Sequence, residues 1–373
     1  MKIAIMGTRG IPACYGGFET FAEELAVRLA ARGHDVTVYC RSRYSQGAGP
    51  SYRGVHRVVL PAVAHKYLDT VSHAFVSVVH GLFCGYDVLL MCNAVNVVFT
   101  ALARLSGQRV AVNVDGIERQ RRKWNWLGKL VYQVSERLVT WLPNVLIADA
   151  RVIEEYYRGR YGARSVVIPY GAPLISIPPG DALRRWSLQS RNYLLYVSRL
   201  EPENHAHTTI EAFLTLETAL PLVIVGDAPY SGQYIATLRR ATSERLDTPC
   251  RGQVLFTGAV YGPAFEELIS NALLYVQATE VGGTHPALLQ AMGAGNLVIA
   301  NDTPEHREVL GPAGLYYRRN DPGDLACQMR DVLREPHKFE GLRSMARVRV
   351  EQHYSWESVT SQYEGLFERM VKA

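Results

Sequence analysis

Near the start of the sequence, Lys2-Ile3-Ala4-Ile5-Met6 is followed by Gly7-Thr8-Arg9-Gly10-Ile11-Pro12-Ala13-Cys14-Tyr15-Gly16-Gly17 and by Phe18-Glu19-Thr20-Phe21-Ala22-Glu23-Glu24-Leu25. The first of these stretches is a short apolar run that ends at a glycine, which is typical of a buried parallel strand. From Phe18 to Arg32 apolar side chains recur at helical spacing, and Gly33 predicts the helix end. A strand, a glycine-rich turn and a helix in this order predict the start of a βαβ unit.

The same alternation continues along the chain and predicts an α/β protein with doubly wound, Rossmann-like sheets. In the first half we expect parallel strands at Lys2–Met6, Asp35–Cys40, Asp87–Cys92, Arg109–Val114, Asn144–Ala148 and Val166–Pro169. In the second half we expect them at Tyr193–Val197, Pro221–Val225, Val254–Thr257, Leu273–Gln277, Leu297–Ala300 and Gly314–Tyr317.

Two domains follow from this pattern. We expect one Rossmann-like domain over residues 1–172, a proline-containing linker over 173–190 and a second such domain over 191–355. An amphipathic helix over 356–373 is expected to cross back to the first domain. Ligands of open α/β sheets bind beyond the carboxyl ends of the strands, so the two sheets are expected to face an interdomain cleft.

Composition agrees with a folded two-domain chain. Its 373 residues are 48% hydrophobic, enough for a sizeable core, which excludes a disordered protein. Residues 1–180 hold 21 Lys and Arg against 12 Asp and Glu, a charge of +9, whereas residues 181–373 hold 19 against 23, a charge of −4. The two halves therefore differ electrically, as two domains with different partners would.

Targeting and redox signals point to the cytoplasm. Met1 leads directly into the first strand, so we expect no signal peptide. No uncharged apolar run reaches the roughly 18–20 residues that a membrane-spanning helix needs. The six cysteines show no metal-ligand or redox spacing, which favours a reduced setting.

The loop Gly7–Gly17 carries a candidate binding site. Its glycines allow backbone N–H groups to approach a phosphate, and the following helix adds a favourable dipole. The spacing fits neither a dinucleotide fingerprint nor a P-loop. We assign Gly16 and Gly17 to the donor-binding set; the alternative is a turn that only needs small residues.

The second half contains a matching loop, Thr279–Gly293, after an expected strand. Gly282 and Gly283 would offer amides to a diphosphate, Thr284 would cap the helix and Gln290 would reach a sugar hydroxyl. The alternative is a capped helix without a ligand. We complete this donor-binding set with Gly226, Gly258, Glu280 and His285.

Charged residues at other strand ends extend the site. Arg199 would clamp a diphosphate because a guanidinium binds phosphate oxygens through two parallel hydrogen bonds, and Asn204 would support it. Asp115 and Glu118 would act as acid/base groups or grip sugar hydroxyls. A solvated arginine and a simple Asp-Gly turn are the alternatives.

The stretch Arg119–Lys129 combines basic and aromatic residues. This combination is typical of protein segments that contact an anionic membrane surface or a lipid pyrophosphate. No nucleic-acid-binding motif accompanies it, and a solvated basic helix is the alternative. No Asp-x-Asp, clustered His/Cys set or G-x-S-x-G is present, which argues against a metal cofactor and serine hydrolysis. The candidate acceptor or membrane contacts are Tyr15, Arg121, Arg122, Lys123, Trp124 and Trp126.

Together these motifs resemble the retaining family 4 glycosyltransferases of the GT-B fold. More narrowly, Gly7–Leu25 resembles the N-terminal motif GTRGIPAxYGGFETFAEEL of a bacterial rhamnosyltransferase-like subgroup. The other stretches that match this subgroup are His65–Thr70, Asn113–Glu118, Ile168–Ala172, Ser198–Asn204 and Val281–Thr284.

The resemblance implies transfer of a hexosyl residue, L-rhamnose from dTDP-L-rhamnose, to a lipid-linked saccharide with retention, in cell-surface polysaccharide synthesis at the inner membrane face. It implies an N-terminal acceptor domain, a C-terminal donor domain and no metal cofactor. Asn204 stands where the broader family has a lysine, Gln290 where it has a glutamate, and His285 where the subgroup has asparagine. A nucleotide-sugar epimerase and a non-catalytic glycan- or nucleotide-binding homologue are the alternatives.

Overall fold

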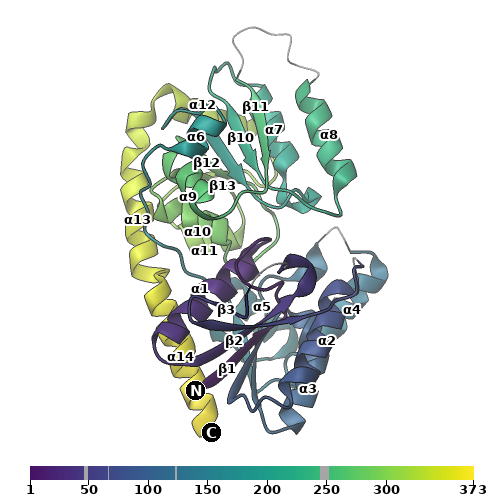
Figure 1. Ribbon diagram of the computed structural model, residues 1–373. Helices are drawn as coiled ribbons and strands as arrows, with labels where there is room; N and C mark the ends of the chain where they lie inside the picture. Colours follow the sequence, from purple (N-terminus) through teal and green to yellow (C-terminus); the bar gives the residue numbers. More distant parts are fainter. Residues whose placement is uncertain (46–48, 66, 122–123, 244–251) are drawn as a thin grey trace. The chain divides into compact units, whose positions relative to one another are not determined.

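The computed structural model describes residues 1–45, 49–65, 67–121, 124–243 and 252–373, and the chain divides into two compact units (Figure 1). Unit 1 comprises Met1–Gly171 and Trp356–Ala373, and unit 2 comprises Ala172–Ser355. Each unit contains its own sheet of mainly parallel strands flanked by helices, which confirms the predicted α/β fold class.

The sheet of unit 1 has, within the described residues, eight strands in the order β3-β4-β2-β1-β5-β6-β7-β8. Only β3 and β4 pair antiparallel; the other neighbours are parallel. The strands are β1 (Lys2–Met6), β2 (Asp35–Arg41), β3 (Ser51–Tyr52), β4 (Val55–Leu60), β5 (Val88–Cys92), β6 (Arg109–Asn113), β7 (Val145–Ala148) and β8 (Val166–Val167).

Sequence reasoning missed β3 and β4. β4 extends the sheet by pairing with β2, with Thr37 opposite His56. His56 and Arg57 interrupt its apolar pattern, so no buried run is visible in the sequence. The other strands of this sheet lie where they were predicted, to within one or two residues at each end.

Helices cover both faces of this sheet. Val78, Val97 and Ala103 from α2 and α3 join one core cluster with β1 residues. The helices of unit 1 are α1 (Gly17–Ala31), α2 (Asp69–Gly81), α3 (Val97–Leu105), α4 (Trp126–Leu138), α5 (Arg151–Tyr161) and α14 (Trp356–Lys372).

The C-terminal helix α14 belongs to unit 1. It lies beside α1, with the rings of Phe21 and Tyr363 5.4 Å apart. The amide of Asn113 donates to the Tyr363 hydroxyl over 2.9 Å, and Arg32 pairs with Glu364 at 2.7 Å. Because side chains alternate along β6, Asn113 points away from the core cluster that holds Val112, so α14 and α2 cover opposite faces.

The sheet of unit 2 is wholly parallel. Its strands, within the described residues, follow the order β11-β10-β9-β12-β13-β14, the doubly wound order in which the chain starts centrally and reverses direction once. They are β9 (Leu194–Val197), β10 (Leu222–Val225), β11 (Val254–Gly258), β12 (Leu274–Gln277), β13 (Leu297–Asn301) and β14 (Leu315–Tyr317), close to the predicted ranges.

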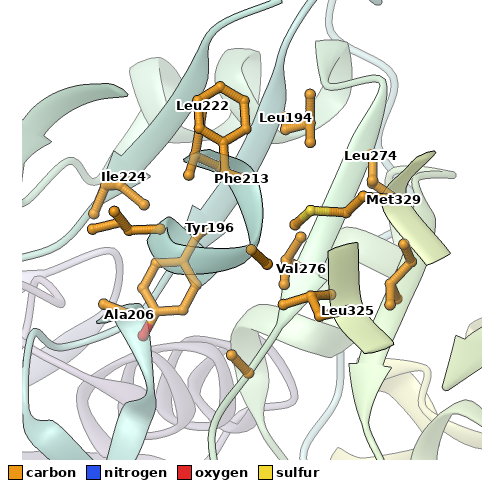
Figure 2. Close-up of a cluster of buried hydrophobic side chains, with 14 of the residues drawn as sticks. Leu194, Tyr196, Ala206, Phe213, Leu222, Ile224, Leu274, Val276, Leu325 and Met329 are labelled. Atoms are coloured by element: carbon orange, nitrogen blue, oxygen red, sulfur yellow. The ribbon is translucent and has the colours of Figure 1, made fainter. Parts of the chain in front are cut away.

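A single apolar cluster lies beneath one face of this sheet. Figure 2 shows Leu194 and Tyr196 of β9 in this cluster with Phe213, Leu325 and Met329, which come from the helices on that face. The helices of unit 2 are α6 (Asp181–Arg185), α7 (Ala206–Leu214), α8 (Gly232–Ser243), α9 (Gly262–Asn271), α10 (Pro286–Gly293), α11 (Pro304–Leu310), α12 (Pro322–Arg334) and α13 (Glu340–His353).

The segment expected to be a linker, residues 173–190, lies within unit 2 and contains α6. The carboxylate of Glu267 accepts hydrogen bonds from the N–H groups of Gly180, Ala182 and Leu183 at 2.6–3.1 Å. A side chain from α9 therefore caps α6, replacing the cap that the sequence next to α6 lacks.

Within the described residues, no helix is both long and apolar enough to cross a bilayer.

Replacing Glu267 with glutamine is expected to lower the free energy of unfolding by about 1 kcal/mol at neutral pH, because the cap loses its charge. Burial raises the pKa of Glu267, but the three backbone N–H groups outweigh it and hold the pKa below its ordinary value of 4.5. Since the folded pKa is depressed, the difference between wild type and Glu267→Gln exists above the ordinary pKa and is lost as the pH falls through the folded pKa. Urea unfolding from pH 7 to pH 3, with Glu266→Gln as control, measures both effects; a difference that grows in acid contradicts this cap.

Candidate functional site

The candidate site of unit 2 lies where its strand order reverses, between the neighbouring strands β9 and β12. Such a switch point is where open α/β sheets bind ligands, because the following loops diverge there. The loop after β9 carries Arg199, and the loop after β12 carries Glu280. The backbone N–H of Glu280 donates to the carbonyl of Glu203 over 3.0 Å, so the two loops are joined directly.

Asn204 organises the loop after β9. Its amide donates to the backbone carbonyl of Arg199 over 2.7 Å, and its own carbonyl accepts from the Tyr196 hydroxyl over 2.7 Å. Arg199 Nη1 lies 3.8 Å from Glu201 Oε2. Asn204 is buried and holds the backbone of Arg199 in place, while its expected role in donor binding stays a prediction.

Two predicted glycines end the strands on the other side of β9. Gly226 has a φ of +151°, and a Cβ there would lie 1.8 Å from the carbonyl oxygen of Ser198. Gly258 has a φ of +74°, but no atom lies within 4 Å of the Cβ it would carry. Gly226 therefore permits close backbone approach between neighbouring loops, whereas Gly258 is required only for its backbone conformation.

The glycine turn after β12 departs from the prediction at its helix cap. The N-cap position of α10 is His285, whose side chain makes no capping hydrogen bond, and Pro286 lies in the first turn. The N-cap position expected at Thr284 is therefore one residue too early. Gly282, Gly283 and Thr284 are buried. A Cβ on Gly282 would lie 2.3 Å from the His285 ring, so a side chain at position 282 would clash with the imidazole in this position. Gln290 lies one turn further along α10 and is half-buried.

Glu280 lies between two basic side chains that sequence reasoning did not select. Its carboxylate is 3.1 Å from His205 Nε2 and 3.3 Å from Arg319 Nη2. His205 follows Asn204 with a left-handed φ of +56°, which turns its ring toward this carboxylate. A left-handed residue before a helix leaves no clear mark in a sequence, and Arg319 is 39 residues distant from Glu280.

A buried histidine supports the same turn. His306 Nδ1 lies 2.8 Å from the Asn301 carbonyl oxygen, and Nε2 lies 3.2 Å from the Thr279 hydroxyl. That hydroxyl is also 3.3 Å from His285 Nε2, and the two imidazole rings are 4.9 Å apart. Burial lowers the pKa of His306 to about 4, so it is neutral at physiological pH and holds this chain of contacts without a charge.

The equivalent switch point of unit 1 lies between β1 and β5. Gly7 has a φ of +92°, and a Cβ there would lie 2.3 Å from the Cys92 carbonyl oxygen. Gly16 is the N-cap of α1 in extended conformation, and Gly17 is the first residue of that helix. The loop is thus built for close backbone packing, while the binding roles of Gly16 and Gly17 stay predictions.

Arg9 organises the remainder of this loop. Its guanidinium lies over the Tyr15 ring at 3.1 Å from the ring centroid, and its backbone N–H donates to Glu19 over 2.8 Å. Asp69 lies 4.0 Å from Arg9 and 2.5 Å from Arg41. Tyr15 therefore packs on a cation of its own loop, and Glu19, Arg41 and Asp69 were not selected from the sequence because their partners are distant along the chain.

The predicted carboxylates differ in their surroundings. Asp115 has a φ of +55°, and its carboxylate accepts from the Tyr170 hydroxyl over 3.2 Å. Glu118 accepts from Arg121 Nε over 2.5 Å and from Trp124 Nε1 over 3.3 Å. Glu118 thus holds the segment that follows it.

The predicted acceptor or membrane contacts differ in their exposure. Arg121 is only 5% exposed and donates to Glu118, so it does not have the expected surface position, and a role toward an acceptor stays a prediction. Trp124 is half-buried, with its ring 5.0 Å from that of Tyr132, whereas Trp126 is 75% exposed. Arg122 and Lys123 lie outside the described residues. Among the side chains that the structure describes, no three His, Cys, Asp or Glu are grouped as a metal site.

Two doubly wound units, each with a glycine-dependent loop at the switch point of its sheet, define a protein of the GT-B architecture. Residues 16–171 match the family model described as Glycosyl transferase 4-like domain, and residues 191–335 match Glycosyl transferases group 1. The chain therefore belongs to the glycosyltransferases of the GT-B fold.

Among curated proteins, the chain is 25% identical over 185 residues to O-antigen chain mannosyltransferase B of Escherichia coli, covering 48% of the chain and 46% of that protein. It is 28% identical over 192 residues to a GDP-mannose-dependent alpha-mannosyltransferase of Mycobacterium tuberculosis, covering 52% of the chain and 46% of that protein. The chain thus spans about half the length of these two curated relatives.

Among solved structures, sucrose-phosphate synthase from Thermosynechococcus elongatus superposes with a TM-score of 0.83 at 18% identity. The match covers 99% of this chain and 98% of that one. At this identity, the likeness establishes a shared fold.

Gly226→Ala is expected to destabilise the protein by about 3 kcal/mol or more, because an unfavourable φ adds to a clash between the new Cβ and the Ser198 carbonyl. Gly258→Ala is the matched control, since it has the strained φ without the clash, and should cost about 1 kcal/mol. Chemical unfolding of both variants measures the difference. Equal losses would show that the close approach at Ser198 has no energetic weight.

Proposed function

We propose that this protein is a glycosyltransferase that moves a hexosyl residue from a nucleoside-diphosphate sugar to a saccharide acceptor with retention of anomeric configuration. The observation that supports it most directly is the placement of Arg199 and the Gly282–Thr284 turn on loops that a hydrogen bond joins at one switch point. A guanidinium and backbone amides are the groups that stabilise a departing diphosphate.

In the proposed reaction the acceptor hydroxyl oxygen bonds to the anomeric carbon on the face that the diphosphate leaves. The bond from that carbon to the diphosphate oxygen breaks, and this oxygen takes the proton of the acceptor hydroxyl. Arg199 neutralises the charge that develops, and Gln290 hydrogen-bonds a donor hydroxyl. Asp115 would orient sugar hydroxyls, and we propose the same role for Glu118. These steps depend on positioning and electrostatics and require no metal and no protein nucleophile.

The neighbours of Arg199, Glu201 and Asn204, fit this proposal. The loop after β9 has a glutamate, Glu201, 3.8 Å from the guanidinium, so the arginine is held before any ligand arrives. No lysine stands at position 204, where Asn204 instead fixes the carbonyl of Arg199. We infer that Arg199 contributes more of the diphosphate neutralisation here than it would beside a second cation.

We propose dTDP-L-rhamnose as the donor, on the N-terminal motif Gly7–Leu25, and a lipid-linked saccharide as the acceptor, with the protein peripheral on the cytoplasmic face of the membrane. GDP-mannose is the second candidate, because one relative carries the name GDP-mannose-dependent alpha-mannosyltransferase.

A thermal-shift screen separates the two donors. A nucleotide sugar that binds the folded state raises the Tm by mass action, by an amount set by its concentration over its Kd. We expect dTDP-L-rhamnose to raise the Tm more than GDP-mannose, UDP-glucose or dTDP alone at the same concentration. A larger shift with GDP-mannose replaces the donor assignment; no shift with any nucleotide sugar contradicts the proposed function.

Product analysis separates the remaining classes. NMR of the donor without acceptor shows a new sugar epimer only if the protein is an epimerase. Binding without transfer to any acceptor of a saccharide panel would identify a non-catalytic homologue.

Arg199→Ala is expected to lower turnover about 100- to 1,000-fold, the usual cost of removing one group that stabilises transition-state charge. Arg199→Lys should recover part of this loss, because it restores the charge without the two parallel hydrogen bonds. Arg330→Ala, at an exposed position on α12, is the control. Initial rates with saturating donor measure the effect, and full activity of Arg199→Ala excludes the proposed role of this residue.

A further inference from the structure

Helices α2, α3 and α4 form one layer on unit 1, and their outward surface is unusually apolar. After each of the three helices, the chain continues into residues of the same hydrophobic core cluster. α2 packs against α3, and α3 packs against α4 (Figure 1). More than half of the exposed large hydrophobic side chains among the described residues belong to these helices or to the residues directly after them.

α4 carries an apolar stripe along its exposed side. Trp126 is 75% exposed, and Leu127, Leu130, Val131 and Val134 follow it at spacings that place them along one side of the helix. The opposite side of α4 is buried through Tyr132 and Ser135. The exposed stripe is therefore not the side that α4 uses for the core.

α2 and α3 extend this surface. Phe75 and Val79 of α2 are exposed one turn apart, and Phe83 follows at 86% exposed. On α3 the exposed residues are Val98, Leu102 and Leu105, with Leu105 also at 86%. The rings of Phe75 and Phe99 lie 5.7 Å apart, which joins the two helices at this surface.

Trp141 lies just beyond α4 and is 63% exposed. Arg137 stands over its ring at 5.6 Å, and Arg104 of α3 donates to the carbonyl of Leu142 over 2.9 Å. The two arginines thus hold the exposed indole beside the C-terminal ends of α3 and α4. We call the exposed apolar side chains of α2, α3 and α4, with Phe83 and Trp141, the apolar face.

The charges on this layer have one sign. On the three helices, all of whose residues are described, the exposed charged side chains are Arg104, Lys129 and Arg137. The carboxylates on these helices are buried. Asp69 is 7% exposed and pairs with Arg41, and Glu136 is 2% exposed and accepts hydrogen bonds from tyrosine hydroxyls. An apolar surface with tryptophans, on helices whose exposed charges are all cations, is complementary to anionic lipid.

We propose that the apolar face is the surface by which this protein docks on an anionic lipid bilayer. A second copy of the chain fits this surface less well, because an isologous contact would set the same cations against one another with no carboxylate to neutralise them. The docking surface is therefore formed by three helices, and Arg121, which is buried, lies outside it. The inference rests on the proposed function in one respect: docking on a bilayer would bring the protein to a lipid-linked acceptor.

Co-sedimentation of the full chain with sucrose-loaded vesicles tests the proposal. We expect binding to phosphatidylglycerol/phosphatidylcholine vesicles that weakens as salt is raised, and little binding to phosphatidylcholine alone. The double variant Leu130→Gln/Val134→Gln should lower the partition coefficient at least tenfold. Lys129→Gln should lower it about fivefold, the usual contribution of one basic side chain near such a surface.

The matched control is Met345→Gln/Val348→Gln, which removes two exposed apolar side chains from α13 of unit 2 and should leave vesicle binding unchanged. Circular dichroism and Tm confirm that each variant folds. Absence of vesicle binding by the wild type, or equal binding by Leu130→Gln/Val134→Gln, overturns the proposal. A wild-type dimer that this variant converts to a monomer, with vesicle binding unaffected, shows instead that a second copy covers the face.

Calorimetry with nucleotide sugar in the absence of vesicles keeps this inference separate from the proposed function. Donor binding without vesicle binding means that only the docking surface is wrong. Vesicle binding without donor binding means that only the proposed function is wrong.

Discussion

The hydrogen bond from Glu280 N–H to the Glu203 carbonyl joins the two loops on which the candidate site of unit 2 depends. It forms because β9 and β12 are parallel neighbours in the sheet, so their carboxyl ends lie at the same edge. Arg199 is far in the sequence from Glu280 and the glycine turn, but these two loops bring them to one edge of the sheet. The strand order therefore assembles the site before any side-chain interaction is considered.

Around this backbone contact, neutral and buried polar groups hold the site. Asn204 binds the carbonyl of Arg199, and His306 reaches the turn through the Thr279 hydroxyl. Because burial keeps His306 neutral, these contacts impose geometry without adding charge near a diphosphate. Arg199 and the backbone amides of the Gly282–Thr284 turn would then supply positive potential, which suits a reaction that depends on stabilising a leaving group.

Sequence reasoning predicted the fold class, most strands to within one or two residues, and the loops that carry the candidate site. It succeeded there because buried parallel strands are apolar runs bounded by turns, and glycines with unusual φ recur at their ends. It failed for β4, whose His56 and Arg57 hide the pattern, and for the N-cap position of α10, which is His285. It also placed Arg121 at the surface, because a run of charges does not reveal that Glu118 binds one of them within the fold.

The sequence by itself determined the alternation of strands and helices, the glycines at the switch points and the excess of positive charge in the first half. These are local properties, set by periodicity and by the conformations that each residue type allows. Only the tertiary structure decided which side chains meet: Glu280 with His205 and Arg319, His306 with Thr279, and the exposed sides of α2, α3 and α4 as one layer. Those partners are separated by tens of residues, and their meeting depends on strand order and helix packing, which no short stretch of sequence encodes.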